Sequence, residues 1–146
     1  PIKDAKDYLD FLFLYKLFFV RRFSAKLSYE IRLHTSETLE GMDKLYETTL
    51  DKVLKFKNGR NHYLIDHDDG FYCAQYLQAW IFEEQLRAVL QKKFGEEWFN
   101  SKEAGRFLTK LWADGQKYDV VELAKMIGYA GLDVNPLLTS IQKQLS

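Results

Sequence analysis

Apolar side chains recur every three or four residues along most of the chain, and the strict alternation typical of β-strands is nearly absent. Glycines, asparagines and other turn or capping residues separate the periodic stretches. Only two prolines occur, Pro1 and Pro136, so few positions break a helix. The pattern predicts an all-α fold of about six helices that are joined by short loops.

Capping and stop signals place the ends of these helices. The expected helices run from about Asp4 to Leu33, from Thr35 or Ser36 to near Lys57, from Gly70–Phe71 to Phe94, from Asn100 to Asp114, and from Asp119 to Gly128. The last begins at Asn135. Asn100 with Glu103 and Asp119 with Glu122 have the spacing of capping boxes. The loop before the third helix has room for a short extended segment at Tyr63–Ile65.

The first and third expected helices are apolar around most of their circumference. Such helices are normally buried in the middle of a larger body. We expect residues 1–146 to form a single helical domain, an irregular bundle that can just bury both helices. A larger parent protein or an oligomer would bury them more easily, and the pattern does not decide between the two.

Charge and composition narrow the classes of partner. Lys plus Arg and Asp plus Glu both number 21, so no net positive charge favours nucleic acid or an anionic membrane. The apolar run YLDFLFLYKLFFV contains Asp10 and Lys16 and falls short of the roughly 20 apolar residues that cross a bilayer. It also lacks the features of a signal peptide. A single cysteine, Cys73, favours a reducing compartment, and we expect a cytoplasmic protein.

The common metal and nucleophile motifs are absent from the sequence. There is no H-E-x-x-H, no cysteine pair, no calcium loop and no glycine-rich phosphate loop. His62 and His67 lie five residues apart without an evident third ligand, which makes a weak zinc signal. Cys73 lies in an apolar helix and is expected to be an inert buried thiol. We therefore expect no metal ligand set in this chain.

The segment HDDGFYCAQYLQAW carries the best candidates for chemistry. Tyr72 and Tyr76 are one helical turn apart, so their hydroxyls share a face, and His67 lies in the loop that leads to that face. A phenol can donate to a developing oxyanion without carrying charge. These groups suit an acyl-transfer site, although two core tyrosines beside a solvated histidine would give the same pattern.

The order H-x-x-x-x-Y-x-x-x-Y, at His67, Tyr72 and Tyr76, resembles the substrate-binding segment of the thimet oligopeptidase and oligoendopeptidase F family of zinc metallopeptidases. FYCAQY is similar to the Phe-Tyr opening of that helix in the oligoendopeptidase F branch. RRFSAKLSYEIRLH looks like the preceding helix, and LWADGQKYDVVELAKMIGYAGLDVNPLL is similar to the closing stretch. The likeness covers roughly Arg22 to Leu138.

The resemblance implies a zincin-like peptidase whose C-terminal portion is this chain. In that family two histidines of H-E-x-x-H and a later glutamate hold zinc, and the motif's glutamate activates water. Those residues would lie upstream, so zinc is expected in the full-length parent and this chain alone should be inactive. His67 and Tyr72 would stabilise the tetrahedral intermediate, and Tyr76 would bind a short peptide substrate. The parent's own N-terminal catalytic part would be a partner.

Two positions depart from the family pattern. Ala79 and Ala74 stand where the two branches carry additional aromatic residues, which puts substrate length and efficiency in doubt. Glu30 is expected to be solvated or paired with arginine, although Arg22 is too far along the helix to reach it. Two other functions stay open. The chain could be a non-catalytic all-α peptide-binding, ligand-binding or scaffold module, or a structural oligomer that buries its first helix between subunits.

Overall fold

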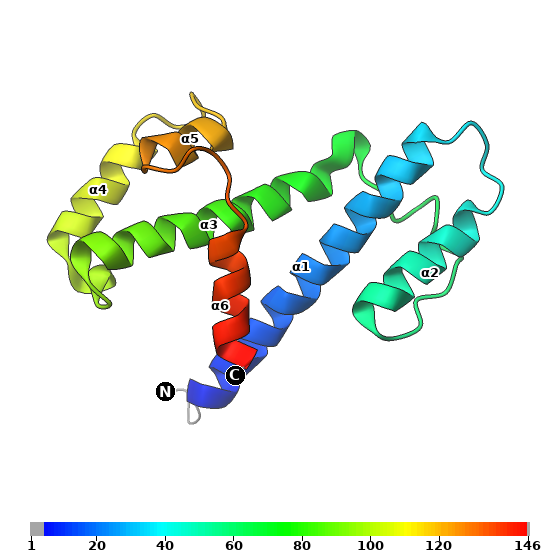
Figure 1. Ribbon diagram of the computed structural model, residues 1–146, viewed down its shortest axis with the longest axis horizontal. Coiled ribbons are helices and arrows are strands. Elements are labelled where there is room, and N and C mark those ends of the chain that lie inside the picture. The colour runs from blue at the N-terminus through cyan, green and yellow to red at the C-terminus, as the bar shows by residue number, and fades with distance from the viewer. Residues whose placement is uncertain (1–4, 146) are drawn as a thin grey trace. The chain divides into compact units, whose positions relative to one another are not determined.

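The computed structural model describes residues 5–145, which contain six α-helices, two short 3-10 helices and no strand (Figure 1). The predicted all-α fold of six helices is therefore confirmed. The chain divides into two compact units, Pro1–Leu77 and Gln78–Ser146. The boundary between the units falls inside the third α-helix.

The first unit is built on two antiparallel helices. Helix α1 spans Ala5–Thr35, α2 spans Met42–Leu54, and α2 lies alongside the second half of α1 (Figure 1). Their facing side chains recur every fourth residue, which places them on one stripe of each helix. This core consists of Ala25, Tyr29 and Leu33 from α1 and Tyr46, Leu50 and Leu54 from α2. The 3-10 helix η1, Asp69–Phe71, then leads into α3, Tyr72–Phe94.

The second unit contains the remainder of α3 and the other helices. These are η2 (Trp98–Asn100), α4 (Lys102–Trp112), α5 (Val120–Met126) and α6 (Asn135–Leu145). Gln85 of α3 is fully buried and uses both ends of its amide. It donates to the Gly131 carbonyl at 3.0 Å and accepts from the Asp133 N–H at 3.1 Å. The loop that precedes α6 is thereby fixed to α3.

Helix α2 begins later than the sequence suggested. Gly41, in a left-handed conformation with φ 74°, precedes Met42, the first residue of the helix. The predicted cap at Thr35 or Ser36 is wrong because these hydroxyls are used elsewhere. Thr35 donates to a carbonyl one turn back in α1, and Ser36 closes the following turn. The expected start of the first helix at Asp4 lies outside the described residues.

Local hydrogen bonds decide the other predicted boundaries. The expected extended segment at Tyr63–Ile65 is wrong, because the Ile65 N–H donates to the His62 carbonyl at 2.9 Å and forms a turn. Helix α4 is capped by Ser101, which accepts from Ala104 N–H, and not by Asn100.

The capping box of α5 forms as predicted. The Glu122 N–H donates to the Asp119 carboxylate at 2.8 Å, and the Asp119 N–H donates to the Glu122 carboxylate at 3.0 Å. Gly95 and Gly128, the predicted stops of the third and fifth helices, both have positive φ. Within residues 5–145, no helix combines the length and hydrophobicity that crossing a bilayer requires.

Truncation of a buried leucine and of an exposed isoleucine should have different effects on stability. Leu50 is completely buried, so Leu50→Ala is expected to lower the free energy of unfolding of the first unit by about 2–5 kcal/mol. Ile65 is 76% exposed, so Ile65→Ala should change it by less than about 0.5 kcal/mol. Urea unfolding followed by far-ultraviolet circular dichroism measures both, and equal effects would contradict the proposed core.

Candidate functional site

The loop that carries His67 is fixed to the helices through the aspartates on either side of that residue. On the first side, the Asp66 carboxylate accepts hydrogen bonds from Arg22 and from the Tyr46 hydroxyl, each at 2.6 Å. Lys26 Nζ lies 3.6 Å from the same carboxylate. Asp66 therefore connects the loop to both α1 and α2.

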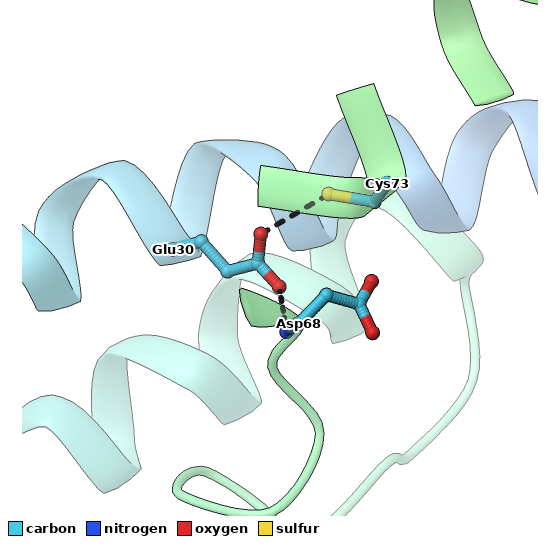
Figure 2. Close-up of side chains that lie close together, drawn as sticks. All are labelled: Glu30, Asp68 and Cys73. Carbon is cyan, nitrogen blue, oxygen red and sulfur yellow. Dashed lines mark hydrogen bonds between the residues drawn. The ribbon is translucent and has the colours of Figure 1, made fainter. Parts of the chain in front are cut away.

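On the other side of His67, Asp68 contacts a buried charge pair on α1. Its carboxylate lies 2.9 Å from Lys26 Nζ, and its backbone N–H donates to Glu30 Oε1 at 2.8 Å (Figure 2). Lys26 and Glu30 are one helical turn apart, with Nζ 3.9 Å from Oε1. Both are buried, and Glu30 is 0% exposed. Buried charges require such partners, so this network holds the loop in one position.

The second oxygen of Glu30 reaches the start of α3. The Cys73 thiol donates to Glu30 Oε2 at 3.1 Å (Figure 2). Burial, together with this hydrogen bond, raises the pKa of Cys73 to about 12. The expected buried position of Cys73 is confirmed, and near neutral pH its thiol is a protonated hydrogen-bond donor. Such a thiol does not act as a nucleophile.

Glu30 differs from its expected environment. It was expected to be solvated or paired with arginine, but it is buried and pairs with Lys26. The reason is that Arg22, two turns earlier, points its guanidinium at Asp66. Lysine at the position four residues before Glu30 is left to balance its charge.

The potential metal-ligand atoms of Glu30, Asp68 and Cys73 lie within 4.8 Å of one another, close enough to bind one metal ion. In this structure the atoms of the group already have partners. Lys26 already supplies the positive charge beside both carboxylates. Zinc is bound by thiolate, whereas the Cys73 thiol here donates its proton in a hydrogen bond to Glu30 Oε2. The cluster is therefore a hydrogen-bond and ion-pair network in which Lys26 is shared by the two carboxylates.

The turn between His67 and α3 has a constrained backbone. Gly70 and Phe71 are both left-handed, with φ of 62° and 56°. For phenylalanine this conformation is a genuine outlier, of a kind that persists only when surrounding contacts enforce it. The Phe71 ring packs edge-on against His34 with centroids 5.3 Å apart, and His34 packs against His67 at 5.8 Å. His34 of α1 therefore contacts both His67 and Phe71 and stabilises the turn.

The two tyrosines lie directly after this turn. Tyr72 and Tyr76 are 48% and 41% exposed, and their rings pack edge-to-face with centroids 5.2 Å apart. Tyr76 also packs against Phe23 of α1 at 5.3 Å. A hydrogen bond with Tyr72 raises the pKa of Tyr76. The alternative reading as two core tyrosines is wrong, because both side chains are exposed.

His67 is partly buried, and its Nδ1 atom is buried without a hydrogen-bond partner. The structure brings His67 against His34, whereas Tyr72 contacts Tyr76. The three predicted residues therefore lie at the two ends of one constrained turn. The sequence did not reveal the network beneath them. Its only signals were the Lys26–Glu30 spacing and the two aspartates that flank His67.

No model of a protein family, no curated protein and no solved structure matches this chain. The resemblance to the oligopeptidase family therefore stays a prediction.

The raised pKa values predict that the first unit loses stability in alkali. Burial raises the pKa of Cys73 and of Tyr29 to about 12 each, and also raises that of Tyr46. These groups hold their protons more tightly in the folded chain than in the unfolded chain. Their contribution is complete below pH 9.0, the ordinary pKa of the thiol, and is lost as the pH rises toward about 12.

Urea unfolding over this pH range measures the effect. Cys73→Ala should show a shallower decline in the free energy of unfolding than the unsubstituted chain, because one of the linked protons is gone. A free energy of unfolding that is constant or rises between pH 9.0 and about 12 would contradict the buried positions of these groups.

Proposed function

We propose that this chain is the C-terminal, substrate-binding part of a zinc metallopeptidase of the thimet oligopeptidase and oligoendopeptidase F type. Its helices would form the zincin-like C-terminal region of a larger enzyme that hydrolyses peptide bonds in short peptides. The 146 residues contain no H-E-x-x-H, so the zinc site belongs to another part of that enzyme. The bound zinc would polarise the scissile carbonyl and activate water.

The observation that carries this proposal is the exposed pair of phenols on a fixed turn. Tyr72 and Tyr76 open α3, remain accessible to a ligand, and follow a left-handed Phe71. Backbone strain clusters at functional sites, and here a strained turn presents two exposed hydroxyl groups. A peptide backbone has the carbonyl and N–H groups that such hydroxyls bind.

Each residue has a separate role in the proposed reaction. Tyr72 donates its hydroxyl proton in a hydrogen bond to the carbonyl oxygen, whose negative charge grows as the tetrahedral intermediate forms. His67 would be the second hydrogen-bonding group, held beside the turn by the anchored aspartates. Tyr76 is protonated near neutral pH, as a phenol ordinarily is, and would bind substrate or support Tyr72 as a neutral donor.

A second candidate function is a non-catalytic all-α module that binds a peptide or another ligand. It is favoured by an open pocket of about 350 Å³ in the first unit, on the side of Asp66. The pocket is lined by Arg22, Tyr46, Asn58, His62, Ile65 and Asp66. Its polar lining could bind a small molecule without any of the three predicted site residues, so Tyr72 would be dispensable for that function.

The substitution Tyr72→Phe tests the catalytic proposal in the full-length enzyme. Loss of one oxyanion donor is expected to lower kcat by roughly 10²-fold, with little change in KM. Tyr8→Phe, on an exposed tyrosine of α1 distant in sequence from the site, is the matched control and should leave kcat unchanged. If Tyr72→Phe also leaves kcat unchanged, Tyr72 has no role in catalysis.

Metal analysis tests whether the zinc site lies outside these 146 residues, as proposed. The isolated 146-residue chain is expected to carry no stoichiometric zinc, because the thiol and carboxylates of its only candidate group among residues 5–145 are already engaged. One zinc per chain in mass-spectrometric metal analysis, abolished by Cys73→Ala, would refute this placement of the zinc site.

The coding sequence upstream of Pro1 gives a second test. An in-frame H-E-x-x-H there would support the proposal, and a start codon directly before Pro1 would contradict it.

A further inference from the structure

Glu30 contacts two residues that adjoin those on which the proposed mechanism depends. Oε1 accepts from the N–H of Asp68, the residue after His67. Oε2 accepts from the thiol of Cys73, the residue after Tyr72 (Figure 2). One side chain on α1 therefore fixes both ends of the constrained turn.

We infer that Glu30 is the positioning residue for the His67–Tyr72 pair, an inference that rests on the proposed function. The hydrogen bonds and the ion pair of Glu30 go to other residues, namely Asp68, Cys73 and Lys26. Glu30 sets where His67 and Tyr72 stand by holding the residue that follows each of them. Lys26 is its counter-ion and anchors Asp68 as well, at 2.9 Å.

Core packing alone does not account for a carboxylate at this position. A buried charge carries a desolvation cost that an apolar side chain of similar volume avoids. Leucine would fill the same space, but it would leave the Asp68 N–H and the Cys73 thiol without their acceptor. Aspartate is one methylene shorter and cannot reach both donors from the same backbone position. The length of glutamate is used, and so is each of its two terminal atoms, which hydrogen-bond to Asp68 and to Cys73.

The constrained turn explains why both ends need an anchor. A left-handed phenylalanine relaxes unless the flanking backbone is held. Asp66 anchors the loop ahead of His67 through Arg22 and Tyr46, and this anchor does not involve Glu30. Loss of Glu30 should therefore leave the Lys26–Asp68 ion pair as the remaining polar contact that holds the segment between His67 and Tyr72, and should loosen this segment while the rest of the loop stays attached.

Nuclear Overhauser contacts between ring protons in the 146-residue chain report on this segment. The His34 and His67 rings, with centroids 5.8 Å apart, should show a cross-peak in the unsubstituted chain. Glu30→Ala is expected to abolish it. Glu30→Asp should abolish it too, and because it keeps the charge opposite Lys26, it is the variant of choice if Glu30→Ala does not fold.

Two further variants separate positioning from general stability. Glu30→Gln should retain the cross-peak, since its amide oxygen can accept from Asp68 N–H and its NH₂ can donate to the Cys73 sulfur. Tyr29→Phe removes another hydrogen bond that α1 makes with the loop before η1, the one from the Tyr29 hydroxyl to the Tyr63 carbonyl at 2.6 Å. It should lower the stability yet retain the cross-peak. A cross-peak that survives Glu30→Asp, or that Tyr29→Phe abolishes equally, overturns the inference.

Kinetics of the full-length enzyme distinguish failure of this inference from failure of the proposed function. Misplacement by about 1 Å can cost roughly 10²-fold in rate, so Glu30→Asp should lower kcat by a comparable factor while Glu30→Gln stays near the unsubstituted value. If Glu30→Asp abolishes the cross-peak but neither it nor Tyr72→Phe changes kcat, the proposed function fails and the positioning stands. If Tyr72→Phe lowers kcat while Glu30→Asp leaves the cross-peak intact, the positioning fails alone.

Discussion

The buried carboxylate of Glu30 is the contact on which the arrangement of the first unit depends. It lies on α1 without solvent exposure, beside Lys26, and accepts one hydrogen bond from the loop and one from the start of α3. An unpaired charge in this position would be strongly unfavourable. The requirement that both Glu30 oxygens and Lys26 find partners therefore determines where Asp68 and Cys73 lie.

Most of the fold could be predicted because the signals are local. The spacing of Asp119 and Glu122 specifies a capping box within four residues, and the structure contains it. Predictions failed where neighbouring polar residues compete for one role. Ser101 and not Asn100 accepts from the Ala104 N–H in the first turn of α4, and Thr35 donates back into α1. Sequence spacing does not say which of two adjacent side chains will have the right backbone conformation.

In the candidate site, too, local features could be predicted from the sequence, whereas long-range contacts could not. The proximity of Tyr72 and Tyr76 follows from one helical turn, so the sequence predicts it directly. The environment of Glu30 depends on residues about forty positions further along the chain. A Lys–Glu pair four residues apart is common on solvated helix faces, so the pair carried no sign of burial. The packing of His34 on His67 likewise depends on how the loop returns to α1.

Hydrogen exchange at the Asp68 amide tests most directly whether Glu30 anchors the loop. This N–H belongs to a loop between helices, and its acceptor is a buried side chain and not a backbone carbonyl. We predict that it exchanges as slowly as the amides of the α1 core around Tyr29, whereas the amide of the exposed neighbour Asp69 exchanges fast. Exchange at Asp68 as fast as at Asp69 would contradict the account.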